Sequence, residues 1–235
     1  MCRFFLYLGG RPPDQLLLDF VEISRKDRTI GWSHGSGWGV LFAKPGGYGL
    51  YKSTRPIWES YIAPPDGYIL YILHSRLASV GSISLENTHP IVYGGYAIAH
   101  NGTLDRGEFA KALRQLGVET KTGGSTDTEL ILKAFVDLGG DLKALKEVAR
   151  LAAQYTVKDE PMMNFVIASL DGSAAYLVTY REVEEPHFTP VISIDNTSVA
   201  AASEPLKGRE NWKIIPNKSI YIYSASNNEV SLDSF

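Results

Sequence analysis

The hydrophobic pattern of the chain consists of short apolar runs near both ends and of apolar residues at helical spacing in the middle. In the N-terminal third, aromatic and β-branched runs that end at Gly or Pro predict buried strands. These strands are 2–8, 37–44, 47–53 and 68–74, and Pro45-Gly46 predicts a hairpin turn between the second and third. One helix is predicted over 13–26, where Pro and Asp precede apolar residues at helical spacing.

The middle of the chain predicts helices, and the last part returns to strands. A loop rich in Gly and Ser is expected over 79–93, before a strand over 96–100. Helices are predicted over 106–116, 126–138 and 142–155, and Thr126 and Glu129 fit a capping box. Further strands are predicted over 165–170, 174–180, 191–194, 199–202 and 220–223. Few strand–helix–strand alternations occur, so an α+β fold is predicted.

Composition and charge narrow the class of protein. The chain has 235 residues, 44% of them apolar and 21% charged, and no linker-like segment divides it, so one domain over 1–235 is expected. A net charge of −3 gives no electrostatic reason to expect nucleic-acid or membrane binding. The single cysteine excludes an intrachain disulfide, and no signal peptide or apolar span of about 18 residues is present, so a cytoplasmic protein is expected.

The single cysteine is Cys2. If Met1 is removed, a thiol and an α-amine lie on the same residue, and the amine, which titrates near pH ~8, can serve as the base for the thiol. A lone cysteine, however, is more often a small buried apolar side chain. The position of Cys2 therefore becomes informative only together with other candidate groups.

Four short polar segments fall where strand ends and loops are predicted. They are 74–79 (HSRLAS), 87–90 (NTHP), 100–104 (HNGTL) and 124–129 (GSTDTE). Each alone has an ordinary structural explanation: Asn101-Gly102 is a common turn dipeptide, and Asp127 is favoured at a helix start. Together with Cys2 they supply what hydrolysis of an amino-acid amide needs: an arginine for a carboxylate, a carboxylate for an ammonium, and N–H donors for an oxyanion.

In this order and spacing, Cys2 and the four segments resemble the class II glutamine amidotransferases, whose glutaminase domain is an N-terminal-nucleophile hydrolase. Residues 31–40 (GWSHGSGWGV) and 202–206 (ASEPL) are more similar still to its stand-alone branch, the amidohydrolases of the Dug3 and ergothioneine-pathway type. The resemblance extends from Cys2 to about Pro216. It implies a four-layer α/β/β/α sandwich of two antiparallel sheets.

The resemblance also implies a role for each site residue. Cys2 is the nucleophile with its α-amine as base, Arg76 binds the substrate α-carboxylate, Asp127 binds the α-ammonium, Asn101 and Gly102 form the oxyanion hole, and His89 shapes the pocket. Two departures from the family pattern are present. Ser36 stands where relatives often carry Asp, and the chain after Arg76 lacks a Trp and a second His, which leaves Ser79 as a candidate hydroxyl donor.

These residues predict hydrolysis of a γ-glutamyl amide through a thioester on Cys2, with removal of Met1 as a condition. The substrate stays open between glutamine, with ammonia passed to a synthase subunit, and a γ-glutamyl conjugate. The alternative is a non-catalytic glutamine-binding or partner-assembly module that retains Met1. The five histidines show no metal-ligand spacing, so no metal and no cofactor are expected, and a homo-oligomer is left open.

Overall fold

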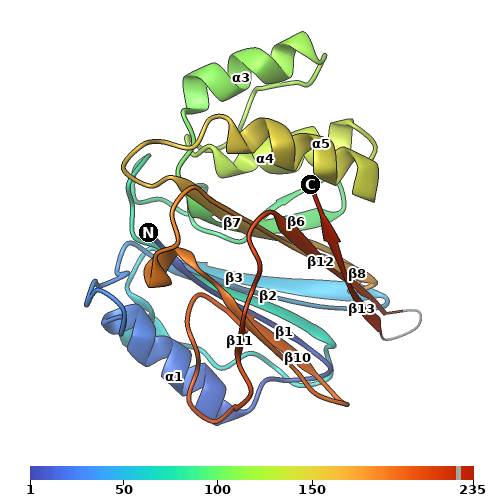
Figure 1. The fold of residues 1–235 in the computed structure, drawn as a ribbon. Coiled ribbons are helices and arrows are strands. Elements are labelled where there is room, and N and C mark those ends of the chain that lie inside the picture. The colour runs from blue at the N-terminus through green and yellow to red at the C-terminus, as the bar shows by residue number, and fades with distance from the viewer. Residues whose placement is uncertain (226–228) are drawn as a thin grey trace.

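Two antiparallel sheets stacked face to face form the centre of the molecule (Figure 1). The structure is a computed structural model and describes residues 1–225 and 229–235. One sheet has the order β11-β9-β10-β1-β4-β2-β3 and the other β13-β12-β8-β7-β6-β5. The first contains β1 (Arg3–Leu8), β2 (Trp38–Lys44), β3 (Gly47–Ser53), β4 (Leu70–Ser75), β9 (Val191–Ile194), β10 (Val199–Ala202) and β11 (Lys213–Ile214). The second contains β5 (Ile91–Tyr93), β6 (Tyr96–Gly102), β7 (Met162–Ser169), β8 (Ala174–Arg181), β12 (Ser219–Ser224) and β13 (Glu229–Ser234).

Helices cover the outer face of each sheet. In Figure 1, α1 lies below the first sheet, and α3, α4 and α5 lie above the second. The helices are α1 (Asp14–Arg25), α2 (Ile57–Ser60), α3 (Arg106–Gln115), α4 (Thr128–Asp137) and α5 (Leu142–Ala153), with a 3₁₀ turn over Pro186–Phe188. The predicted four-layer α/β/β/α sandwich is therefore confirmed.

Strand β1 shows why the layers form. Side chains alternate between the two faces of a strand. Phe4 and Leu6 accordingly pack between the two sheets, whereas Phe5 and Tyr7 pack against α1. Because both faces are covered, the strand is apolar throughout, and this explains the continuous run in the sequence.

The predicted capping box at Thr126 and Glu129 is wrong. Helix α4 begins at Thr128 with Asp127 as its N-cap, and no side chain caps it. The Glu129 carboxylate instead accepts the backbone N–H groups of Gly123 and Gly124, at 2.9 and 3.0 Å. Glu129 thus binds the loop before the helix, not the helix N-terminus.

Several elements differ from the prediction because their sequence signal is weak. The expected loop over 79–93 ends in a strand, β5, and β7 begins at Met162 instead of Phe165. The short helix α2 and the strands β11 and β13 were not predicted. Both residues of β11 and most of those of β13 are exposed, so neither strand carries a buried apolar run.

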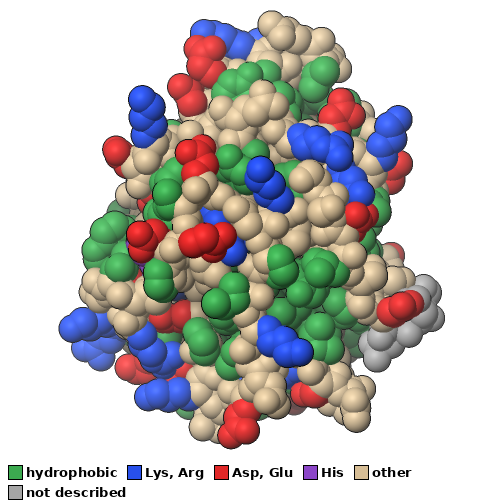
Figure 2. All heavy atoms as spheres, viewed as in Figure 1, with side chains coloured by type: hydrophobic (Ala, Val, Ile, Leu, Met, Phe, Trp, Pro, Cys, Tyr) green, Lys and Arg blue, Asp and Glu red, His purple; other side chains and the backbone are tan. Residues whose placement is uncertain are grey.

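The face of the molecule drawn in Figure 2 shows no preference for one charge. On the face drawn in Figure 2, Lys and Arg side chains are interspersed with Asp and Glu. In the described part of the chain, none of the helices combines the length and apolar character needed to cross a bilayer.

Candidate active site

The ends of strands from both sheets bring the predicted site residues together. Cys2 immediately precedes β1, Arg76 follows β4, and Asn101 lies near the end of β6. Pairing of Arg3 with Ser75 in the first sheet places Cys2 beside the segment that follows β4. The side-chain amide of Asn101 reaches across from the second sheet and donates to the backbone oxygen of Cys2 at 2.9 Å.

The Cys2 thiol lies at the start of the segment after Arg76. Its Sγ accepts the backbone N–H of Leu77 at 3.3 Å and lies 3.6 Å from the Leu77 oxygen. Burial raises the pKa of the thiol, while the nearby N-terminal ammonium, the Leu77 N–H and Arg76 act in the opposite direction. The thiol is therefore protonated at neutral pH, and a base is needed to make it a nucleophile.

Met1 occupies a closed position next to this thiol. Its ammonium pairs with the Glu160 carboxylate at 2.9 Å, and its side chain, 2% exposed, packs with Met162 and Phe188. Its carbonyl oxygen lies 2.8 Å from Nδ1 of His34. With Met1 attached, the nitrogen of Cys2 is an amide and cannot accept a proton.

Asn101 and Gly102, the predicted oxyanion-hole residues, lie at the end of β6. The two hydrogens of the Asn101 amide point to the backbone oxygen of Cys2 and to the Ser203 hydroxyl, each at 2.9 Å. Gly102 has a φ of +132°, and a Cβ there would lie 2.5 Å from the backbone oxygen of Met162. Only glycine fits this conformation and this close approach.

Arg76 is buried and orders the loop that follows it. Its guanidinium donates to the backbone oxygens of Val80, Gly81 and Ser82, at 2.6 to 3.4 Å. Burial lowers its pKa, while the charges of Cys2 and Asp127 act in the opposite direction. The fork keeps further N–H groups available for an incoming carboxylate.

Asp127 is held at the start of α4. Its Oδ2 accepts the backbone N–H of Leu104 at 2.7 Å and lies 3.9 Å from Nδ1 of His100. The side chain is almost fully buried, and this burial raises the pKa of the carboxyl. A cation brought to this site would favour the charged form.

Ser79 joins a chain of hydroxyls that leads to the N-terminus. Its Oγ lies 2.9 Å from Oγ1 of Thr103, and Thr103 donates to Glu160 at 2.6 Å. Glu160 in turn holds the Met1 ammonium. In this structure the Ser79 hydroxyl is therefore linked through Thr103 to the Met1 side of the site.

Three buried histidines form a neutral cluster behind the site. The ring centroids of His74 and His89 lie 4.4 Å apart with the rings tilted by 53°, and Nδ1 of His89 accepts the backbone N–H of His100. Burial lowers the pKa of His74 to about 3 and lowers those of His89 and His100. All three are neutral near pH 7, which suits shape and hydrogen bonding better than proton transfer.

The stability of the fold is expected to fall between pH 7 and pH 5. Four buried histidines (His34, His74, His89 and His100) have lower pKa values folded than the ordinary value of 6.5, so the unfolded chain binds more protons as the pH falls through that value. For His34 and His74, with folded values of about 4 and about 3, the loss is about 2 kcal/mol each. Urea unfolding at pH 7 and at pH 5 measures this loss of stability, and an equal free energy of unfolding at the two pH values would contradict the prediction.

Sequence reasoning assigned no role to several residues that contact the site. Glu160, Thr103 and Ser203 touch Met1, Glu160 and Asn101 respectively. Ser203 lies in segment 202–206, so the family resemblance of that segment could have pointed to it. Glu160 stands in a turn that belongs to no recognised motif. Ser36, a departure from the family pattern, binds the segment after β4 through its N–H to the Arg76 oxygen at 2.8 Å and its Oγ to Ala78.

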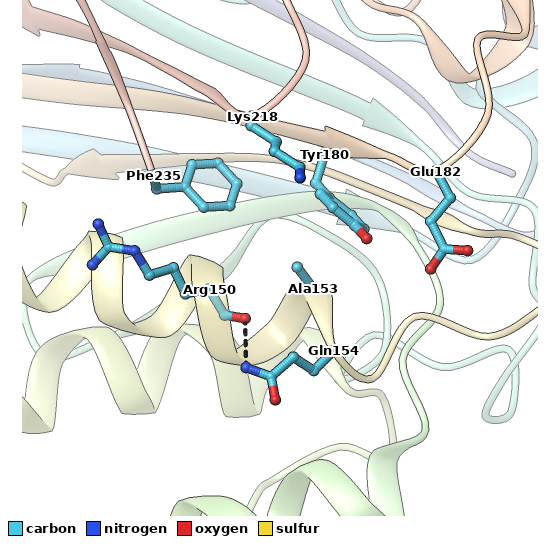
Figure 3. Close-up of a pocket in the computed structure, with 7 residues that line it drawn as sticks. All are labelled: Arg150, Ala153, Gln154, Tyr180, Glu182, Lys218 and Phe235. Atoms are coloured by element: carbon cyan, nitrogen blue, oxygen red, sulfur yellow. Dashed lines mark hydrogen bonds between the residues drawn. The ribbon is translucent and has the colours of Figure 1, made fainter.

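Two of the surface pockets are lined by none of the predicted site residues. One, of about 330 Å³, opens between α5 and β8 and is lined by Arg150, Ala153, Gln154, Tyr180, Glu182, Lys218 and Phe235 (Figure 3). A second, of about 320 Å³, reaches Ser203 and Glu204. Within the described ranges 1–225 and 229–235, no three His, Cys, Asp or Glu side chains are grouped so as to hold a metal ion.

Comparison with known proteins agrees with this architecture. Glutamine phosphoribosylpyrophosphate (PRPP) amidotransferase from B. subtilis superposes with a TM-score of 0.73 at 16% identity, over 99% of this chain and 49% of that one. A glutamine aminotransferase class-II domain protein (SPO2029) from Silicibacter pomeroyi gives 0.66 at 18%, over 100% and 99%. The fold is thus that of the N-terminal-nucleophile amidotransferases, and the chain spans about half the length of the PRPP enzyme.

The family follows from the sequence match. The family model for class II glutamine amidotransferases matches residues 1–185. A protein named "Putative glutamine amidotransferase YafJ", from Escherichia coli (strain K12), is 25% identical over 266 aligned positions, covering 93% of this chain and 96% of that protein. The chain belongs to the class II glutamine amidotransferase family.

Proposed function

We propose that the protein hydrolyses a γ-glutamyl amide through a thioester on Cys2, after removal of Met1. The observation that carries the proposal is that Cys2 contacts the segment after Arg76 through its thiol and the Asn101 amide through its backbone oxygen, at the meeting point of the two sheets. Family membership supports amide chemistry on glutamine in general. The proposal goes beyond family membership in naming Cys2 as the nucleophile and a γ-glutamyl amide as the substrate.

The steps follow from the groups present. The α-amine of Cys2 accepts the thiol proton as Sγ attacks the side-chain carbonyl of the substrate, and the Asn101 amide and the Gly102 N–H stabilise the oxyanion. The resulting α-ammonium returns the proton to the departing amine. Water then attacks the thioester, which releases glutamate and restores the thiol.

Two buried groups of opposite charge fit the other end of the substrate. Arg76 would bind the α-carboxylate and Asp127 the α-ammonium of the glutamyl group. In this arrangement the Asn101 amide exchanges its Ser203 acceptor for the oxyanion. His89, neutral and packed against His74, would shape the wall of the pocket, and Ser79 would line the side that faces Glu160.

Removal of Met1 is expected to switch the activity on. The test compares protein whose intact mass shows the loss of Met1 with protein carrying an uncleaved N-terminal extension, and follows glutamate release from glutamine and from γ-glutamyl-amine conjugates. Only the processed form should turn over, because an amide nitrogen cannot serve as the base. Equal turnover by the extended form would contradict the proposal. A preference for glutamine would indicate a glutaminase that supplies a synthase, and a preference for γ-glutamyl-amine conjugates would indicate a conjugate hydrolase.

One observation favours the alternative, a glutamine-binding module that retains Met1. The Met1 ammonium is paired with Glu160 and the side chain is buried, so the unprocessed N-terminus is well accommodated. This alternative predicts that protein from the native host keeps Met1 and binds glutamine without releasing glutamate. Intact-mass measurement together with glutamine titration distinguishes the two.

A further inference from the structure

The loop before β2 carries a buried charge network to which none of the predicted site residues belongs. The Asp27 Oδ1 accepts the backbone N–H groups of Ile30 and Gly31, at 2.8 and 3.1 Å. Its Oδ2 pairs with the Arg3 guanidinium at 2.9 Å and with Nε2 of His34 at 3.0 Å. Asp27 is 2% exposed, and Arg3 and His34 are fully buried. The carboxylate is therefore rigidly held, and it holds the imidazole.

His34 lies between two oxygen acceptors. Nε2 faces the Asp27 carboxylate, and Nδ1 faces the carbonyl oxygen of Met1 at 2.8 Å. A neutral imidazole has one N–H and can donate to only one of them. Burial and the Arg3 cation lower the pKa of His34 to about 4, so the doubly protonated ring is disfavoured at neutral pH. With Met1 attached, one of the two contacts lacks a hydrogen.

Removal of Met1 resolves this mismatch. Hydrolysis of the Met1–Cys2 bond by water releases methionine with its carboxylate and leaves an amine on Cys2. The oxygen and nitrogen of a peptide group are about 2.3 Å apart, so the new amine lies within about 5 Å of Nδ1 before any adjustment. The acceptor facing Nδ1 is thus removed, and a donor remains close enough to reach Nδ1 after a shift of about 2 Å.

We propose that His34, oriented by Asp27, is the positioning residue for the α-amine of Cys2 in the processed protein. Nε2–H donates to Asp27, and Nδ1 accepts an N–H of the amine, which leaves the amine lone pair for the thiol proton. When the amine becomes an ammonium, the same contact is a charge-assisted hydrogen bond. This role rests on the proposed function, because it requires Met1 to be removed and the amine to act as base.

Other charges at the N-terminus and around Asp27 stay in place in every variant at His34. Glu160, from the turn before β7, and His187, from the 3₁₀ turn, interact with the N-terminal ammonium, whereas Arg3 from β1 and Glu204 from the segment after β10 interact with Asp27. A comparison of variants at His34 alone therefore isolates the contribution of Nδ1. Asp27 and Arg3 remain paired in each of them.

The test reads the amine directly. Because Cys2 is the only cysteine, labelling with [¹⁵N]cysteine gives one signal whose pH titration reports the amine pKa. In His34→Phe, which removes the acceptor, the amine pKa is expected to fall by about one pH unit. His34→Asn, which keeps an acceptor near the place of Nδ1, should shift it by less than about half a unit. The apparent pKa of the acid limb of the kcat/KM pH profile should shift in the same direction as the amine pKa. In His34→Phe, kcat should be about 10–100-fold lower with KM unchanged.

Equal amine pKa values in wild type and His34→Phe would overturn the inference. A readout that needs no substitution is the ring tautomer of His34 by ¹⁵N NMR of the processed protein: Nε2–H is expected, and Nδ1–H would contradict it.

The titration of the amine does not depend on turnover. If the amine pKa depends on His34 but wild type releases no glutamate, the proposed function fails and the contact stands. If wild type is active and the pKa does not respond, only the role of His34 fails.

Discussion

Replacing Cys2 with alanine is expected to lower turnover by about 10⁴–10⁶-fold, because the variant keeps the α-amine but has no nucleophile. Met1 should still be removed, since alanine is as small as cysteine. Glutamate release measures the loss. Intact mass after a brief incubation with substrate should show one γ-glutamyl group on the wild type and none on the variant.

The matched control is Cys2→Ser, which keeps a group that can accept the Leu77 N–H and keeps the α-amine. It should fold with the wild-type melting temperature and retain only weak activity, since a hydroxyl is far less nucleophilic than a thiol. A Cys2→Ala protein that still turns over, or is still labelled by an electrophilic glutamine analogue, would show that Cys2 is not the nucleophile.

The second large effect is expected at Asn101. Removing one oxyanion donor typically costs about 10²–10³-fold in kcat with little change in KM, so Asn101→Ala should lose that much. The same amide also bridges the backbone oxygen of Cys2 and the Ser203 hydroxyl. Steady-state kinetics of the variant alone therefore does not separate the chemical role from the structural one.

Ser203→Ala provides the separation. This variant removes one acceptor of the Asn101 amide and the acceptor of the Phe4 N–H, with no contact to the substrate. We expect it to lower the free energy of unfolding by about 1–3 kcal/mol and to keep kcat within about tenfold. An equal fall of kcat in Ser203→Ala and Asn101→Ala would show that Asn101 acts by holding Cys2 in place and not as an oxyanion donor.

Secondary structure was predictable where burial leaves a periodic or continuous apolar signal. Strand β1, covered on both faces, and helix α5, with one apolar face, follow directly from their residues. The exposed strands β11 and β13 carry no such signal. The capping box failed because Glu129 had a competing partner, the loop N–H groups of Gly123 and Gly124, which local sequence does not reveal.

By itself, the sequence determined the inventory of reactive groups and their order along the chain: one cysteine at position 2 and four polar segments, enough to indicate the family and hence the four layers. Only the tertiary structure decided which other groups meet the N-terminus. Glu160, 159 positions from Met1, and the Asp27–His34 pair reach it because strands from two sheets end at one place. Such contacts depend on through-space packing, which leaves no local pattern in the chain. The position of Cys2 therefore predicted a nucleophile, and the fold identified the groups that surround the N-terminus.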